Sequence, residues 1–324
     1  MKSANVGLAA RHDDPAEALA QAVEVLQSAK SVLCVAHAHP DADALGSSLG
    51  LALALREMGR AVTLFCATDI PHNCDFLPGV GTRVSELPAD ASFDATVVCD
   101  VGHSSRIGPG LPPREKLGKL LNIDHHLTSD DFGDVNLVDA HAAAVGVLIL
   151  RVLKGLKHPP GKDVATALYT SILTDTGSFR YSSTNPEALH AAAECVVAGA
   201  DPWTISSSIY EQNPVERLRL RRDVLGTLHV SDDGLFASLM VTHAMQEATK
   251  TRADLTDGFI NFARGIRGVE VAAQFTEPAP GSGEPWRLSF RSRGKVNVAR
   301  VAGHFGGGGH HNAAGARIAG SLDE

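Results

Sequence analysis

Four short apolar segments in the first half of the chain constrain the fold most. Residues 31–36, 61–66, 95–100 and 120–124 are rich in Val, Leu and Cys and lie between turn-forming residues, which is typical of strands buried on both faces. Residues 45–58 and 142–153 have helical patterns. Because parallel strands need long crossover connections, this order predicts an α/β fold with a doubly wound, mostly parallel sheet.

The pattern changes after residue 184. Residues 185–226 look helical, and Pro186, Pro202 and Pro214 each stand where a first helical turn would begin. Beyond them, apparent strands at 235–240, 269–276 and 286–290 and a helix over about 257–266 predict a smaller α+β domain. We therefore expect four segments: an N-terminal arm (1–20), a site-bearing domain (21–184), a helical connector (185–226) and an α+β domain (227–324).

Composition excludes several classes of protein. With 29 basic and 37 acidic residues the net charge is -8, which disfavours a protein that binds long nucleic acids mainly by neutralising phosphates. Aromatic residues make up 5%, too few for an extended base-stacking surface. No apolar run reaches the roughly 18 residues of a membrane span. Five scattered cysteines and the lack of a signal-peptide pattern predict a cytoplasmic location.

Acidic and imidazole side chains gather where three of the apolar segments end. The residues concerned are His37, Asp41, Asp43, Asp100, Asp124, His125 and His126, and Asp175 ends a longer, helix-like run. In an open parallel sheet the carboxyl ends of the strands border one crevice, so we expect these side chains to converge there. A single Asp at such a place is commonly only a helix N-cap, and for Asp43 that interpretation stays open.

The converging set predicts metal binding. Several carboxylates in one crevice would repel one another unless cations were present. Oxygen and nitrogen donors without thiolates favour Mn²⁺ or Mg²⁺ over a structural zinc site. The donors outnumber the needs of one ion, and two ions about 3.5–4 Å apart are the usual arrangement for displacement at phosphorus.

Four motifs resemble those of the DHH phosphoesterase family: H-A-H-P-D-A-D-A-L-G-S, V-V-C-D, D-H-H and T-D-T-G-S-F-R-Y. The C-terminal G-G-G-G-H-H-N-A-A-G is similar to the signature of the companion DHHA1 domain. One departure is Ala42, where the family usually has Gly.

The resemblance implies a role for each residue of the cluster. One ion would be held by His37, Asp41 and Asp100, and the other by Asp43, Asp100, His125 and Asp175. Asp100 would bridge the two ions. The remaining catalytic residues would be His126, facing the scissile phosphate, and Asp124, orienting its neighbours.

Candidate substrate-binding residues come mainly from the second domain. Backbone N–H groups of the glycine run could face a phosphate, and we select Gly307, Gly308, Gly309 and His310. Arg291 is the candidate for gripping a terminal phosphate with two parallel hydrogen bonds, and Arg106 is a weaker candidate. The alternatives are a flexible turn and exposed arginines.

The whole pattern predicts a phosphoesterase that uses two Mn²⁺ ions, with Mg²⁺ or Co²⁺ as alternatives. Its resemblance to stand-alone bacterial members implies short RNA or DNA oligonucleotides or 3'-phosphoadenosine 5'-phosphate as substrates. Cyclic or linear dinucleotides, and a non-catalytic oligonucleotide-binding module, remain alternatives. No membrane partner is expected, and a homodimer is left open.

Overall fold

The computed structural model describes residues 14–251, 253–256 and 258–320, and the chain divides into two compact units, one ending at Gln212 and one beginning at Asn213. The first unit is built on a six-stranded sheet in the order β3-β2-β1-β4-β5-β6. Every pairing in it is parallel. Its strands are β1 Ser31–Ala36, β2 Ala61–Phe65, β3 Arg83–Val84, β4 Ala95–Cys99, β5 Lys119–Asp124 and β6 Val135–Val138. The predicted mostly parallel sheet is confirmed.

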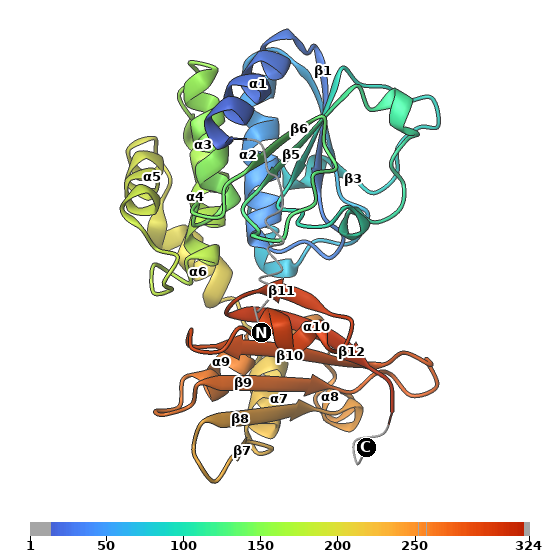
Figure 1. Ribbon diagram of the computed structural model, residues 1–324, viewed down its shortest axis with the longest axis vertical. Helices are drawn as coiled ribbons and strands as arrows, with labels where there is room; N and C mark the ends of the chain where they lie inside the picture. Colours follow the sequence, from blue (N-terminus) through green and yellow to red (C-terminus); the bar gives the residue numbers. More distant parts are fainter. Residues whose placement is uncertain (1–13, 252, 257, 321–324) are drawn as a thin grey trace, which may run out of the picture. The chain divides into compact units, whose positions relative to one another are not determined.

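The helices of this unit share one core with one face of the sheet (Figure 1). They are α1 Pro15–Ser28, α2 Ala42–Glu57, α3 Val145–Gly155, α4 Lys162–Asp175, α5 Pro186–Val197 and α6 Pro202–Tyr210. In β1, Val32 and Cys34 point to this core, whereas Leu33 and Val35 join a second cluster on the other face. That second cluster is closed by loops and by the short 3-10 segment η3 Ser104–Ile107. Because both faces are covered, most strand positions are apolar.

Further 3-10 turns connect the strands and helices. They are η1 His72–Cys74, η2 Val80–Thr82, η4 Arg114–Lys116 and η5 Ala253–Thr256. None of the helices in the described ranges combines the length and the apolar character that a membrane crossing requires.

The N-terminal arm expected over residues 1–20 lies partly outside the described residues. Within them, helix α1 begins at Pro15 with Asp14 as its N-cap, and Ala18 and Leu26 are completely buried. An Asp-Pro pair is a helix-start signal, because the ring of proline fits the first turn and the carboxylate accepts a free N–H. Residues from Asp14 onward therefore belong to the first unit.

The helical stretch 185–226 is divided between the two units. Cys195 of α5 and Ile205 of α6 are buried in the core of the first unit. Helix α7, Val215–Leu225, buries Leu220 and Val224 in the second. The helices form where expected, but each has a buried face within its own unit.

The second unit is a mixed sheet in the order β11-β12-β10-β9-β8-β7 with helices on both faces. All its pairings are antiparallel except that of β8 with β9. Its strands are β7 His229–Val230, β8 Phe236–Val241, β9 Val271–Thr276, β10 Trp286–Ser292, β11 Gly308–His310 and β12 Ala313–Ile318. Its helices, besides α7, are α8 His243–Thr249, α9 Ile260–Arg264 and α10 Val298–Gly303. The predicted α+β domain is confirmed.

The strand order of the first sheet places a topological switch point between β1 and β4. The chain moves outward from β1 to β2 and β3, then returns to the other side of β1 at β4. The connections that follow β1 and β4 therefore separate, and in open parallel sheets ligands bind at the carboxyl ends of such strands.

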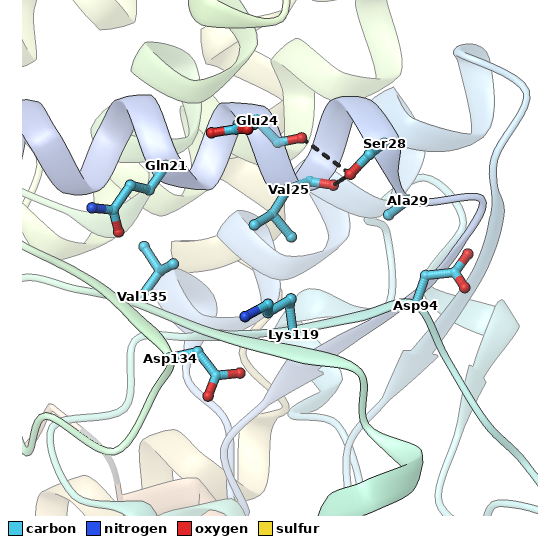
Figure 2. Close-up of a pocket in the computed structure, with 9 residues that line it drawn as sticks. All are labelled: Gln21, Glu24, Val25, Ser28, Ala29, Asp94, Lys119, Asp134 and Val135. Atoms are coloured by element: carbon cyan, nitrogen blue, oxygen red, sulfur yellow. Dashed lines mark hydrogen bonds between the residues drawn. The ribbon is translucent and has the colours of Figure 1, made fainter.

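The opposite edge of the sheet, where the strands begin, carries the pocket of Figure 2. It is lined by residues of α1 together with Asp94, Lys119 and Asp134. The carboxylates there hold the strands in place: Asp94 Oδ2 accepts the backbone N–H groups of Lys30 at 2.8 Å and Ser31 at 2.9 Å. Asp134 Oδ2 accepts the Leu120 N–H at 2.9 Å. These acidic residues thus have structural roles.

Candidate metal centre

The first motif supplies three side chains from the end of β1 and the start of α2. His37 follows β1 and is buried. Asp41 is the N-cap of α2, and its Oδ1 accepts the N–H groups of Asp43 and Ala44, both at 3.0 Å. The capping role left open for Asp43 therefore belongs to Asp41. Asp43 lies in the first turn with only 2% of its surface exposed.

Asp100 follows β4 in a left-handed conformation with φ of 61°. This conformation costs a side chain other than glycine some free energy, although Asp and Asn tolerate it best. The backbone N–H of Asp100 bonds to the Ile123 carbonyl at 3.0 Å, which ties the end of β4 to β5. A strained, buried carboxylate held in this way at a ligand crevice is a candidate functional residue.

The expected convergence is observed, because three overlapping groups of donor atoms form at the carboxyl ends of the strands. The atoms of each group lie within 4.8 Å of one another. The groups are His37, Asp41 and Asp100; Asp43, His125 and Asp175; and Asp100, His125 and His126.

His125 stands at the centre of the cluster. Its Nε2 is 3.8 Å from Asp43 Oδ2 and 3.6 Å from both Asp100 Oδ1 and Asp175 Oδ2. Its Nδ1 lies 3.1 Å from the Ala142 carbonyl, which can only accept, so Nδ1 carries a proton. Nε2 is thereby aimed at the three carboxylates. Asp175 is the last residue of α4.

His37 is oriented in the same manner. Its Nδ1 donates to the Ala38 carbonyl at 2.9 Å, and Nε2 lies 3.8 Å from Asp100 Oδ2. Burial lowers the pKa of His37, outweighing the opposite influence of Asp41, so the ring is neutral and Nε2 offers a lone pair. Arg106, in η3, donates to this Nε2 at 3.2 Å. The structure therefore brings Arg106 to the cluster.

The carboxylates of the cluster call for positive charge. Burial, followed by the neighbouring Asp43, raises the pKa of Asp100 well above its usual range. Burial also raises the pKa of Asp43, against the opposing effect of His125. Among the described residues, Asp100 Oδ1 is buried and finds no hydrogen-bond donor. Buried carboxylate oxygens without donors are costly unless a cation is near, so these residues fit a divalent metal ion.

His126 and Asp124 form a separate pair beside the cluster. His126 Nδ1 lies 2.7 Å from Asp124 Oδ1. Burial alone would raise the pKa of Asp124, but the hydrogen bonds from His126 and Ser129 and the nearby imidazoles together outweigh it and lower that pKa to about 2. An ionised Asp124 makes His126 Nδ1 a donor and fixes the orientation of the ring. Asp124 is completely buried, and its carboxylate is also bonded by the Ser129 side chain.

The candidates of the second unit lie at one end of its sheet. Arg291 of β10 pairs with Ala313 of β12, which also pairs with His310 of β11, so the three form one row across the strands. Arg291 is half-buried, and its Nη1 donates to the Phe290 carbonyl at 3.0 Å.

The glycine run forms part of β11 instead of a free loop. A Cβ on Gly307 would lie 2.1 Å from the Gly315 carbonyl oxygen, and one on Gly309 would lie 2.5 Å from that of Ala313. Gly308 and Gly306 have open space, with nothing within 4 Å of such an atom, but Gly306 has a φ of 70° that favours glycine. Close approach to β12 therefore explains Gly307 and Gly309, and Gly308 has no such packing requirement.

Three contacts of the cluster were not predicted from the sequence. Ala142 supplies the carbonyl that orients His125. Val145 N–H donates to Asp43 Oδ2 at 3.0 Å, and the Ser171 hydroxyl lies 2.5 Å from Asp43 Oδ1. Ser171 precedes Asp175 by one helical turn, a spacing that places both on one side of α4 and could have drawn attention to it.

Comparisons with known proteins agree with this architecture. The family model described as DHH family, N-terminal domain, matches residues 31–172, and the DHHA1 domain matches residues 239–324. The chain is 34% identical over 306 residues to the bifunctional oligoribonuclease and PAP phosphatase NrnA of Thermus thermophilus, covering 93% of this chain and 89% of that protein. It is 28% identical to the protein of the same name from Bacillus subtilis, covering 87% of each.

A solved structure is also similar over the whole chain. The exopolyphosphatase-related protein of Bacteroides fragilis superimposes with a TM-score of 0.85 at 26% identity, covering 95% of this chain and 93% of that one. Fold, cluster and comparisons together define a metal-dependent phosphoesterase. The chain belongs to the DHH family, with an N-terminal DHH domain and a C-terminal DHHA1 domain.

Proposed function

We propose that this protein hydrolyses the phosphate esters of short oligonucleotides and of 3'-phosphoadenosine 5'-phosphate with the help of two divalent ions, Mn²⁺ in the first place. The observation that carries the proposal is the buried Asp100 oxygen that lacks a donor, surrounded by carboxylates and imidazoles from four separate segments. The names of the relatives from Thermus thermophilus and Bacillus subtilis support the choice of substrates.

Two overlapping sets of residues would hold the ions. The first set is His37, Asp41 and Asp100, and the second is Asp43, Asp100, His125 and Asp175. Asp100 is the only residue that we place in both, in keeping with its contacts to both imidazoles. When bound, such ions activate water and neutralise charge that develops on a phosphate.

The chain's own residues contribute orientation and proton positions. Asp124 accepts the Nδ1–H of His126 and keeps the ring from turning, and His126 would face the scissile phosphate. Arg106 offers a guanidinium next to His37, where it would bind a phosphate oxygen once an ion takes its place at Nε2.

The second unit would bind the distal part of the substrate through Arg291 and the backbone around Gly308 and His310. Replacing Arg291 with Ala should raise KM about tenfold or more with little change in kcat, because the interaction is equal in the ground and transition states. Arg317→Ala is the matched control, since Arg317 lies on the neighbouring β12 and is exposed in an ion pair with Glu284. Equal effects of the two variants would contradict the role of Arg291.

A hydrolysis panel in Mn²⁺ tests the proposal. It compares 3'-phosphoadenosine 5'-phosphate, dinucleotides to pentanucleotides, cyclic dinucleotides and inorganic pyrophosphate. We expect the first two classes to be cleaved fastest and Asp100→Asn to abolish all turnover. Faster cleavage of cyclic dinucleotides would favour that alternative, and binding of oligonucleotides without any turnover would favour a non-catalytic module. The cytoplasmic location and the homodimer stay predictions.

A further inference from the structure

Asp43 is held from two sides by contacts that differ for its two oxygens. Oδ2 faces the cluster, 3.8 Å from His125 Nε2, and accepts the Val145 N–H at 3.0 Å. Oδ1 faces away from His125 toward α4, where the Ser171 hydroxyl lies at 2.5 Å. Both Asp43 and Ser171 are buried, with 2% and 0% of their surfaces exposed. The side chain thus has one oxygen available to the cluster and one engaged by a neighbour.

The direction of the Ser171 hydrogen bond follows from its other contact. The backbone N–H of Gly146, at the start of α3, points at Ser171 Oγ from 2.9 Å. An N–H group can only donate, so the hydroxyl oxygen is an acceptor there. Its own proton is then directed to Asp43 Oδ1. The 2.5 Å between Ser171 Oγ and Asp43 Oδ1 is short, as is usual when a hydroxyl donates to a carboxylate.

The neighbouring hydroxyls of α4 behave differently. Thr166, Thr170 and Thr174 each donate to the carbonyl four residues earlier, which is the usual contact of such residues inside a helix. Ser171 is the one among them that turns to a side chain of another element, 128 residues away in sequence. Its contact is therefore tertiary.

Ser171 is tightly packed against two neighbouring helices. A Cβ on Gly146 would lie 2.2 Å from Ser171 Oγ, and one on Gly46 of α2 would lie 3.0 Å from Ser171 Cβ. Three helices, α2, α3 and α4, thus meet at this residue. The same helix α4 carries Asp175 one turn further on, so Ser171 links two candidate ligands, Asp175 through the helix and Asp43 through its hydrogen bond.

We propose that Ser171 is a positioning residue for the second metal ion, which holds Asp43 Oδ1 so that Oδ2 is presented with Asp175 and His125. The inference rests on the proposed function, because it takes these three residues as ligands. Removing the hydroxyl leaves the Gly146 N–H and Asp43 Oδ1 without partners and lets the carboxylate turn. Partners behind a metal ligand of this kind commonly change metal affinity by about 10- to 100-fold.

The test is a Mn²⁺ titration of the full chain. Binding is measured by calorimetry and, independently, by the electron paramagnetic resonance signal of free Mn²⁺. The wild type should bind two ions. In Ser171→Ala the Kd of one ion should rise about 10- to 100-fold with the other unchanged, and kcat should recover when Mn²⁺ is raised in the same proportion. Ser48→Ala is the matched control, because Ser48 is equally buried on α2 but bonds only to backbone carbonyls, at 2.6 Å and 3.3 Å.

A second variant keeps the test decisive if Ser171→Ala folds poorly. Ser171→Cys retains the volume but is a weak donor, so the same selective loss of one ion is expected. If both Ser171 variants bound the two ions with the same Kd values as the wild type, the inference would be overturned and the proposed function would stand. Equal weakening of both ions, or a loss of kcat that excess Mn²⁺ does not restore, would show a general structural role and also overturn it. A wild type that binds no second ion would overturn the proposed function itself.

Discussion

Asp100→Asn should stabilise the metal-free protein while removing its response to metal. Asp41 and Asp100 present oxygens within 4.8 Å of each other in one donor group. At that distance and an effective dielectric constant of about 20, two ionised carboxylates repel by about 3.5 kcal/mol. Protonation and the nearby Arg106 relieve part of this repulsion, so a neutral amide at position 100 should contribute roughly 2 kcal/mol of stability.

The predicted gain corresponds to a rise in Tm of about 4–8 °C for a unit of this size. Asn has nearly the shape of Asp and also tolerates the left-handed backbone of φ 61°, so the exchange adds no strain. The assay is thermal unfolding followed by circular dichroism at pH 7.5, in EDTA and in 1 mM MnCl₂ as about the working concentration for such sites. Wild type should gain Tm with Mn²⁺, whereas Asp100→Asn should start higher in EDTA and gain nothing.

Asp134→Asn is the control variant, for which the expected change in Tm has the opposite sign. Asp134 lies at the other edge of the sheet, where it accepts hydrogen bonds from the Leu120 N–H and from Arg114. Burial alone would raise its pKa, but these bonds and the neighbouring basic side chains together hold it below the usual range. Its replacement should lower Tm equally with and without Mn²⁺. A lower Tm for Asp100→Asn in EDTA together with a full response to Mn²⁺ would refute the reasoning.

Two further predictions concern residues outside the metal cluster, one in each unit. Arg151→Met should lower the free energy of unfolding at pH 7 by about 1–2 kcal/mol after allowing for solvent screening, since Arg151 bonds Asp139 at 2.7 Å and Glu187 at 2.6 Å. Arg151 lowers the pKa of Glu187, and together with His141 it lowers the pKa of Asp139 against the effect of burial. This stability is therefore fully present above the unfolded pKa values of 3.8 and 4.5, and it is lost as pH falls through the folded pKa values. Urea unfolding should show the difference between variant and wild type shrinking at pH 3, and a difference independent of pH would contradict the prediction. In the second unit, Gly307→Ala should lower Tm because of its 2.1 Å approach to the Gly315 carbonyl, whereas Gly308→Ala should keep Tm and raise KM several-fold. Unchanged KM in Gly308→Ala would remove Gly308 from the substrate site.

The sheet of the first unit could be predicted because its strands are buried on both faces. Continuous apolar runs such as Ser31–Ala36 read as strands in the sequence and have these limits in the structure. The site followed from the same pattern, since side chains after parallel strands meet at one edge. The short strands Arg83–Val84 and Val135–Val138 were missed, because two to four residues carry too little pattern.

Helix ends were harder to place. Asp41 and Asp43 are two residues apart, and the sequence did not show which one caps the helix, because capping depends on where the first helical turn starts. Asp14 and Pro15 form a helix-start signal inside the segment predicted to be an N-terminal arm, and α1 begins there.

Tertiary polar contacts had no local signature. Ser171 donates to a residue 128 positions away, although a serine in a helix ordinarily bonds its own backbone. Gly307 was predicted to present its backbone to a phosphate, with a flexible turn as the alternative. In the structure its lack of a side chain allows the close approach to the next strand that accompanies the pairing of Gly308–His310. Such contacts become visible only when the packing of separate elements is known.

Anomalous diffraction at the manganese edge from crystals soaked in MnCl₂ tests the central claim most directly. Our account places two peaks in the first unit, one contacting His37, Asp41 and Asp100, the other contacting Asp43, Asp100, His125 and Asp175. A single peak, or peaks away from Asp100, would contradict it.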